Sequence, residues 1–104
     1  MICLKSKDLL TRTQLESSWK MQGLTTSRQP DGETTRLIVI DLRDGDALEQ
    51  ISQSLEGFPQ AQVVAFGPHV DGERLKAAKT AGAHTVLARS AVKDKVQEMA
   101  AKLS

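Results

Sequence analysis

The sequence has few of the residues on which several protein classes depend. Only 3% of its 104 residues are aromatic, tyrosine is absent, and there is a single cysteine, Cys3. One cysteine cannot form an internal disulfide or a multi-cysteine zinc site, so the composition suits a reducing cytoplasm. No stretch approaches the roughly 20 apolar residues of a membrane-spanning helix, and the opening residues, MICLK, lack the apolar core of a signal peptide. We therefore expect a soluble, cytoplasmic protein without a membrane partner.

The sequence also lacks an excess of charge of either sign. Fourteen basic and thirteen acidic residues give a formal net charge of +1, and no run of about five like charges marks a basic patch or an acidic tail. Such a chain has no general attraction for nucleic acid, so we expect no nucleic-acid partner. Because domains commonly have roughly 100–150 residues, residues 1–104 are expected to form a single domain.

Motifs of the common enzyme classes are missing as well. The chain contains no GxGxxG, GxSxG or P-loop pattern. His69 and His84 stand alone, without a second metal-type ligand at a useful spacing, so no metal site is predicted. Cys3 lies in a short apolar segment, where a cysteine serves as a small core residue. We therefore expect a protein that is not an enzyme and that carries no cofactor.

Three short apolar runs predict strands that are buried on both faces of a sheet. They are LIVI at residues 37–40, QVVAF at residues 62–66 and TVLA at residues 85–88. The runs are continuous rather than alternating, which is typical of parallel strands covered by helices on both sides. Asp41 closes the first run, and a Gly-Pro pair ends the second, because proline does not continue a central strand.

Helix signals follow the first two of these strands. Asp46 and Glu49 have the spacing of a capping box and predict a helix over residues 46–55. Asp71 is placed to cap a second helix, and Gly82 stands where the residue after a helix is commonly glycine.

The last helix has the most regular pattern of the three. Ser90 is its predicted N-cap, and the apolar residues that follow recur at helical spacing: Val92, Val96, Met99 and Leu103. From residue 36 onward, a strand is thus followed by a helix three times, with connections suited to right-handed crossovers onto one parallel sheet. The predicted fold class is α/β, with helices on both faces of the sheet.

The first third of the chain is less regular. Residues 2–4 predict a short strand, and a helix occupies part of residues 8–22. Thr13 and Glu16 form another capping-box pair, so this helix starts either early in that stretch or as late as Thr13. A thin strand at residues 24–28 is followed by a turn, QPDGE. Only about seven residues then precede the next strand, too few for a helical crossover. Either a bare loop replaces a helix here or the two strands form an antiparallel hairpin.

The segment from residue 37 to residue 103 resembles the receiver domain of two-component response regulators, a flavodoxin-like, doubly wound sheet of five parallel strands. LIVIDL at residues 37–42 is similar to the receiver strand that ends in the phosphoacceptor, which makes Asp41 the phosphoacceptor-equivalent residue. AGAHTVL at residues 81–87 is similar to the approach to the fifth strand. The resemblance implies a pocket around Asp41 at the carboxyl ends of the strands. Its expected members are Lys5, Gly67, Arg89 and Ser90.

The chain departs from the receiver pattern in the residues that carry the chemistry. Receivers have an acidic pair after the first strand, whereas residues 4–7 read LKSK, and Gly67 stands in place of a Ser or Thr. A lone carboxylate at Asp41 between Lys5 and Arg89 offers too little charge and too few oxygens for Mg²⁺. Phosphoryl transfer depends on that charge neutralisation. The resemblance therefore implies a degenerate pseudo-receiver. We expect Asp41 to form a structural ion pair with these two cations, and binding of a small anion or ligand by this pocket is the alternative.

Three functions follow from these observations. The leading hypothesis is a non-catalytic interaction module in signalling that binds another protein or a second copy of itself. The resemblance implies a face within residues 70–103, where five residues are expected to face solvent: Gly72, Glu73, Lys76, Lys79 and Thr80. The second hypothesis is a working phosphoacceptor that uses Asp41, with Asp8, Asp44 or Asp46 helping to hold a cation. The third is a flavodoxin-like carrier of a small ligand, for which the chain offers no phosphate-binding loop.

Overall fold

The computed structural model describes residues 1–103, along which strands and helices alternate. The strands are β1 (Ile2–Lys5), β2 (Thr26–Ser27), β3 (Leu37–Asp41), β4 (Gln62–Gly67) and β5 (Thr85–Ala88). The helices are α1 (Leu9–Met21), α2 (Ala47–Gly57), α3 (Gly72–Thr80) and α4 (Arg89–Leu103). This order confirms the α/β class, and the start of α1 at Leu9 agrees with the earlier of the two predicted starts.

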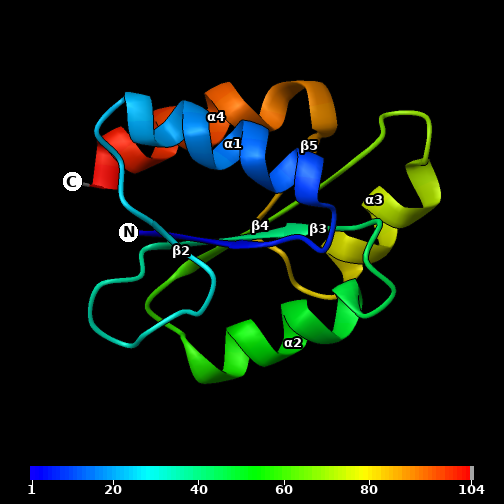
Figure 1. Ribbon diagram of the computed structural model, residues 1–104. Coiled ribbons are helices and arrows are strands. Elements are labelled where there is room, and N and C mark those ends of the chain that lie inside the picture. Colours follow the sequence, from blue (N-terminus) through cyan, green and yellow to red (C-terminus); the bar gives the residue numbers. More distant parts are fainter. Residues whose placement is uncertain (104) are drawn as a thin grey trace.

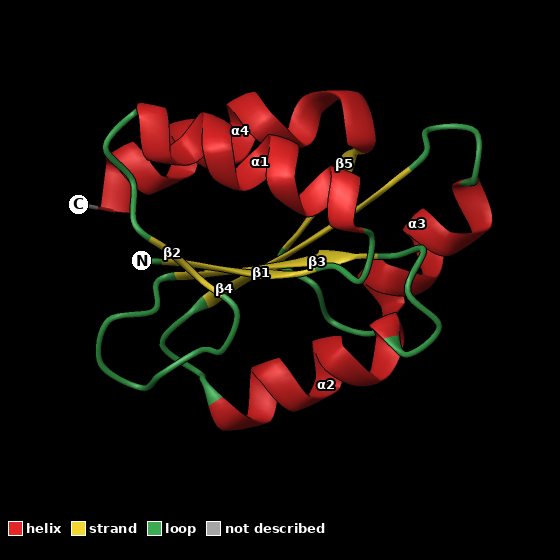
Figure 2. Ribbon diagram, viewed as in Figure 1, coloured by secondary structure: helices red, strands yellow, loops and turns green. Residues whose placement is uncertain are grey.

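The strands form one sheet in the order β2-β1-β3-β4-β5. Every neighbouring pair is parallel. Helices α1 and α4 cover one face of the sheet, and α2 and α3 cover the other (Figures 1 and 2). The chain starts near the middle of the sheet and winds toward both edges, which is the doubly wound, flavodoxin-like fold that the sequence predicts.

The connection between β2 and β3 contains no helix. Strand β2 pairs with one side of β1, and β3 pairs with the other side. Because β1 lies between them, the antiparallel hairpin alternative is wrong, and a bare loop at residues 28–36 replaces the helix. A loop of this length easily spans the roughly 10 Å across one intervening strand.

Asp31 organises this loop through its side chain. Its carboxylate accepts hydrogen bonds from the backbone N–H groups of Glu33 (2.9 Å) and Thr34 (2.6 Å) and from the Thr34 hydroxyl (2.6 Å). The buried Thr35 hydroxyl accepts a bond from the N–H of Asp31 at 2.9 Å. The bonds to Thr34 and Glu33 lower the pKa of Asp31. Side-chain bonds thus fix a segment that has no backbone ladder of its own.

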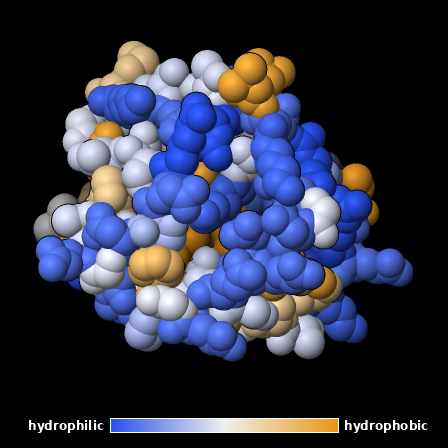
Figure 3. Space-filling view, turned by 60° about the horizontal axis from the view of Figure 1, so that its bottom comes forward, coloured by the Kyte–Doolittle hydropathy of each residue, from blue (hydrophilic) through white to orange (hydrophobic). Residues whose placement is uncertain are grey.

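Alternate residues of β1, β3, β4 and β5 enter two separate cores. Leu4 and Val39 pack with Trp19 beneath α1 and α4. Cys3 and Ile38 belong to the core beneath α2 and α3. Cys3 is completely buried, as predicted for a core residue, and burial raises the pKa of its thiol. The outer surface on the α2 side is largely hydrophilic, with small, separate apolar patches (Figure 3).

Of the three predicted N-caps at Asp71, Asp46 and Ser90, the structure has one and lacks two. Asp71 caps α3, because its carboxylate accepts a hydrogen bond from the N–H of Arg74 at 3.2 Å. Asp46 precedes α2, but its side chain bonds to that of Gln50 at 3.1 Å instead of capping the helix, so the predicted capping box is wrong. Ser90 lies inside α4, which begins directly after β5 and leaves no capping position between the two elements. The predicted Ser90 cap is therefore wrong.

Candidate functional site

Asp41 is the last residue of β3 and is completely buried. Both of its carboxylate oxygens are engaged. The Ser6 hydroxyl donates to Oδ2 at 2.8 Å, and the backbone N–H of Arg43 donates to Oδ1 at 3.0 Å. The Arg43 guanidinium lies beside them, with Nε 3.6 Å from Oδ1. A buried carboxylate requires such partners, and the chain supplies them from its own side chains and backbone.

Ser6, rather than Lys5, is the residue of this segment that reaches Asp41. Lys5 lies opposite Ile40 in the sheet, one residue before Asp41. Successive side chains of a strand point to opposite faces. Lys5 therefore points away from Asp41, and its Nζ lies 3.4 Å from Oε1 of Gln29. The expected ion pair between Lys5 and Asp41 is wrong for this reason.

Arg43 connects Asp41 to the start of α1. Its NH2 nitrogen lies 2.8 Å from Oδ2 of Asp8 and 3.0 Å from the Thr11 hydroxyl. The Thr11 hydroxyl donates to Asp8 and accepts a hydrogen bond from Arg89. A hydroxyl has one proton and two lone pairs. Thr11, which is buried, therefore uses its full bonding capacity in joining these three side chains.

The charges in this network alternate in sign. Hydrogen bonds from Thr11 and Arg43 lower the pKa of Asp8. Burial acts to lower the pKa of Arg43, but the bond to Asp8 and the charge of Asp41 outweigh it, so that pKa is raised. Arg89 adds a second cation, 3.9 Å from Asp8. Two carboxylates and two guanidiniums leave the site near neutrality, with little field to attract either an anion or a cation.

Two more aspartates lie next to this network. Asp44 accepts hydrogen bonds from the backbone N–H of Lys7 at 3.2 and 3.1 Å, and burial raises its pKa. The Lys7 ammonium lies 3.3 Å from Oδ1 of Asp46. Each carboxylate thus has its own partner. Within residues 1–103, no group of three or more His, Cys, Asp or Glu side chains is placed to hold a metal ion.

The other residues expected around Asp41 form no hydrogen bond or ion pair with its carboxylate in the described part of the chain. Gly67 lies at the end of β4 in the opposite core, where an added Cβ would be 3.4 Å from its nearest neighbour, a leucine of that core. Arg89 bonds to Thr11 instead of Asp41, and Ser90 is exposed on α4. The expected ion pair between Arg89 and Asp41 is therefore wrong, because the Thr11 hydroxyl takes the guanidinium.

Sequence reasoning missed three residues of this site: Ser6, Thr11 and Arg43. A signal for Ser6 exists, because the alternation that sends Lys5 to one face sends the next residue to the other. Arg43 follows Asp41 by two residues, the spacing at which an aspartate accepts the N–H of an Asx turn. Thr11 carries no comparable signal, since its contacts depend on how α1 packs beside the start of α4.

The histidines lie on the surface, as predicted. His69 is exposed in the loop between β4 and α3. His84 precedes β5, and its Nδ1 accepts a hydrogen bond from the N–H of Val63 at 2.9 Å. This bond, together with that from the His84 N–H to the Val63 carbonyl at 2.9 Å, ties the start of β5 to β4.

The face within residues 70–103 combines exposed charges with half-buried apolar residues. The five residues expected to face solvent there are all exposed: Gly72, Glu73, Lys76, Lys79 and Thr80. Strand β5 forms the edge of the sheet, and each of its residues is half-buried. A hollow of about 410 Å³ lies along it, with Leu75 and Val86 in its apolar wall.

Comparison with known proteins bears on the fold. No protein-family model matches the sequence, and no curated protein matches it. The receiver domain of NtrX from Brucella abortus is similar over 98% of this chain and 96% of its own, with a TM-score of 0.79 and 18% identity. An orphan response regulator of H. pylori is similar over 99% of this chain and 95% of its own, with a TM-score of 0.73 and 18% identity.

A third similar structure is a response regulator from Burkholderia pseudomallei that was solved with a phosphorylated aspartic acid, a calcium ion and citrate. It matches 91% of this chain and 62% of its own, with a TM-score of 0.74 and 17% identity. Together these likenesses show that the chain has the fold of a response-regulator receiver domain, which confirms the resemblance drawn from the sequence. Among residues 1–103, no helix is both long and apolar enough to span a membrane.

Proposed function

We propose that the protein is a non-catalytic, receiver-like interaction module in two-component signalling, a pseudo-receiver that works in the cytoplasm without a cofactor. The observation that carries this proposal is the closed environment of Asp41. Its carboxylate is buried, and its oxygens are engaged by Ser6 and Arg43.

The chemistry of phosphoryl transfer explains why this environment matters. An aspartate that accepts a phosphoryl group needs a free oxygen for attack and a cation that neutralises the transferred group. In this chain the Arg43 guanidinium occupies the cationic position and is also bound to Asp8. Phosphorylation would require Arg43 to leave both carboxylates, and a divalent cation would have to compete with a charge that is already in place.

Phosphorylation of Asp41 is the second candidate function, and one observation favours it. Asp41 lies at the carboxyl end of a central strand, the usual position of a ligand site in an open α/β sheet. The Arg43 side chain is 38% exposed, so it has room to swing toward water. The similar Burkholderia pseudomallei response regulator carries a phosphorylated aspartic acid together with a calcium ion.

Intact-mass spectrometry separates the two candidates. The protein is incubated with Mg²⁺ and acetyl phosphate beside two variants, Asp41→Asn and the exposed control Asp94→Asn. The proposal predicts no phosphoryl adduct on any of the three proteins. An adduct on the wild type and on Asp94→Asn that is absent from Asp41→Asn would overturn the pseudo-receiver proposal and establish Asp41 as a phosphoacceptor.

The interaction itself is assigned to the surface formed by α3, β5 and α4. An exposed sheet edge with a half-buried apolar strand is open to a partner. Lys76 and Lys79 stand beside it without ion pairs within residues 1–103. The partner is either another protein or a second copy of this chain, which would form a symmetric, self-complementary contact.

Charge reversal on this surface tests the assignment. Lys76→Glu combined with Lys79→Glu changes the proposed face, and Lys20→Glu, on the exposed side of α1, is the matched control. Self-association is measured by analytical ultracentrifugation, and protein contacts are mapped by cross-linking and mass spectrometry. We expect the double variant to lose the contact and the control to retain it. Contacts that map to other faces, or that survive the double variant unchanged, would contradict the assignment.

A further inference from the structure

A second hollow, of about 480 Å³, opens at the amino ends of the strands, at the opposite end of the sheet from Asp41. Its floor is formed by the first residues of β1 and β3, Ile2 and Leu37, both buried. Volumes of roughly 300–1,000 Å³ are usual for small-molecule sites. The hollow contains none of the residues that surround Asp41, so it is independent of the phosphorylation question raised above.

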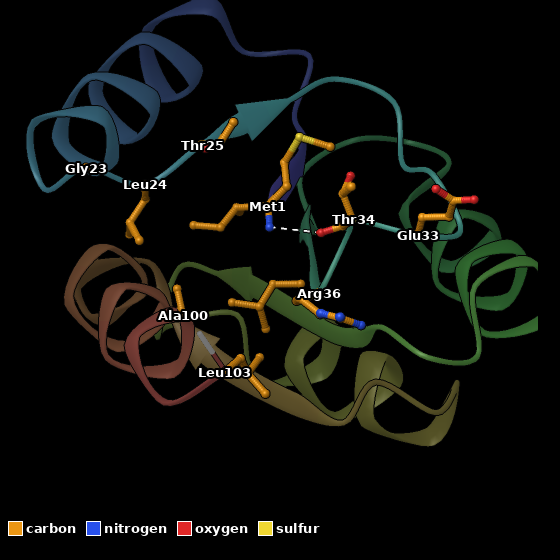
Figure 4. A pocket seen from close by; sticks show the side chains of 11 residues that line it. Met1, Gly23, Leu24, Thr25, Glu33, Thr34, Arg36, Ala100 and Leu103 are labelled. Atoms are coloured by element: carbon orange, nitrogen blue, oxygen red, sulfur yellow. Dashed lines mark hydrogen bonds between the residues drawn. The ribbon is translucent and has the colours of Figure 1, made fainter.

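One side of the hollow is apolar. Leu24, which follows α1, and Ala100 and Leu103, near the end of α4, lie on that side (Figure 4). Leu24 and Ala100 are half-buried, and Leu103 is 39% exposed. When an apolar group covers an apolar wall that is in contact with water, the free energy of the system falls.

The other side is polar and carries Arg36. Two hydrogen bonds fix the backbone of Arg36. Its N–H donates to the Met1 carbonyl at 3.0 Å, and its carbonyl accepts a bond from the N–H of Gln62 at 2.9 Å. Its guanidinium, in contrast, makes no hydrogen bond or ion pair with any described residue. An anchored arginine with a free planar head group is suited to a carboxylate, which it binds with two parallel hydrogen bonds.

The remaining charges around the hollow leave this arginine available. The Met1 ammonium donates to the Thr34 carbonyl at 3.0 Å, drawn as the dashed line in Figure 4. Glu33 is exposed on the outer rim, and its side chain points away from Met1 and Leu24 in that view. No ion pair forms between Glu33 and Arg36 within residues 1–103. Among residues 1–103, the polar side of the hollow therefore carries a guanidinium without a charge partner.

We infer that this hollow binds a small amphipathic carboxylate, with its apolar chain against Leu24 and Leu37 and its carboxylate on Arg36. The site exists because of the loop at residues 28–36. That loop brings Glu33 and Thr34 to the rim and leads directly into Arg36.

Titration with hexanoate, followed by ¹H–¹⁵N correlation NMR, tests the inference. Hexanoate is expected to give saturable shifts at the amides of Ile2, Leu24 and Leu37. Two probes of the same chain length serve as controls: hexanol, which is uncharged, and hexylamine, which has the opposite charge. Both are expected to bind about tenfold more weakly or not at all, because neither forms the charge-assisted bonds to Arg36.

Variants then assign the recognition to individual residues. Arg36→Gln is expected to weaken hexanoate binding about tenfold or more, since it removes the charged donor. Arg28→Gln changes an exposed arginine of the same loop that has no ion pair with another described residue. It is the matched control and should bind as the wild type does. Ala100→Leu narrows the apolar side and should also weaken binding. Unshifted backbone signals elsewhere in each spectrum establish that the variants are folded.

Three results would overturn the inference. One is the absence of saturable shifts around the hollow with hexanoate. Another is equal affinity for hexanoate and hexanol, which would leave Arg36 without a part in recognition. The third is that Arg36→Gln and Arg28→Gln weaken hexanoate binding equally. Binding would then depend on the net charge of the protein and not on Arg36. Because no step involves Asp41, each of these results is separable from the phosphorylation assay.

Discussion

An arginine side chain lies at each end of the sheet, and the two differ in their surroundings. At the carboxyl end, Arg43 lies against Asp41 and Asp8, and the chain neutralises its own site. At the amino end, Arg36 stands beside an apolar hollow with no partner among residues 1–103. Open α/β sheets usually bind ligands at the carboxyl end. Under the functions proposed above, the usual site is closed by its own arginine, and the ligand site lies at the other end of the sheet.

The largest expected effect concerns the packing that supports the amino end. Trp19 is completely buried near the end of α1, and its Nε1 donates to the carbonyl of Lys93 in α4 at 3.1 Å. We expect Trp19→Ala to lower the free energy of unfolding by about 3–5 kcal/mol, because it leaves a cavity and removes the hydrogen bond between α1 and α4. Urea denaturation measures the change.

Met21→Ala is the control for this variant. Met21 belongs to the same helix but is 84% exposed, so a change within about 0.5 kcal/mol is expected. Equal effects of the two substitutions would mean that the junction of α1 and α4 does not support this end of the sheet.

The next effect concerns the closed carboxyl end. Asp41→Asn removes the charge that faces Arg43 and weakens the bonds from Ser6 and from the Arg43 N–H. We expect a loss of about 1–3 kcal/mol in the free energy of unfolding. The loss should be smaller than that for a fully buried ion pair, because the partly exposed Arg43 side chain can turn to water. A substitution without effect on urea denaturation would show that the network does not stabilise the fold.

A smaller effect is expected where α3 leads into β5, again at the amino end. Gly82 has a φ of +107°, and an added Cβ would lie 2.7 Å from Cδ1 of Leu55. Gly82→Ala should therefore lower the free energy of unfolding by about 1 kcal/mol. Gly57→Ala has open space around it and should be neutral or stabilising. Thermal unfolding of the two variants and the wild type measures the difference. A Gly82→Ala protein that unfolds at the same temperature as the wild type would show that the backbone of Gly82 is not strained by a side chain.

The smallest effect is a pH dependence at the carboxyl end. Below the ordinary pKa of 3.8, protonation removes the stability that ionised Asp8 contributes, and the loss is complete once the pH has fallen through its lowered pKa. Asp44 has the opposite effect, because its raised pKa means that its ionised form destabilises the fold. Protonation removes this destabilisation as the pH falls from the raised pKa to 3.8. On acidification, the wild type should lose stability relative to Asp8→Asn and gain stability relative to Asp44→Asn. Urea denaturation across this range measures both differences, and shifts in the same direction would contradict the assignment.

The architecture could be predicted from the sequence more fully than the site. The continuous apolar runs and the Asp71 cap indicate elements through local patterns, and the structure has them. The hairpin alternative was wrong because β2 and β3 both pair with β1 and not with each other, and no local sequence pattern reveals this pairing. The partners of Asp41 were misassigned because Lys5 and Ser6 differ in which face they point to, a property of sheet register rather than of residue type.

The hollow at the amino end could not be predicted from the sequence at all. Leu24, Arg36 and Leu103 are far apart in the chain, and their proximity depends on how the loop and α4 meet the strand ends. Nothing in the local pattern around Arg36 distinguishes it from Arg28, which lies in the same loop. The distinction comes only from the neighbouring apolar wall.

The central claim is that Arg43 already occupies the cationic position beside Asp41. Titration of the ¹⁵N-labelled protein with millimolar Mg²⁺, followed through the backbone amides of Ser6, Asp41 and Arg43, tests it most directly. If the site is closed, these signals stay in place and move no more than that of the exposed Asp94. A saturable shift confined to Ser6, Asp41 and Arg43 would mean that a metal ion displaces the guanidinium, and it would contradict the claim.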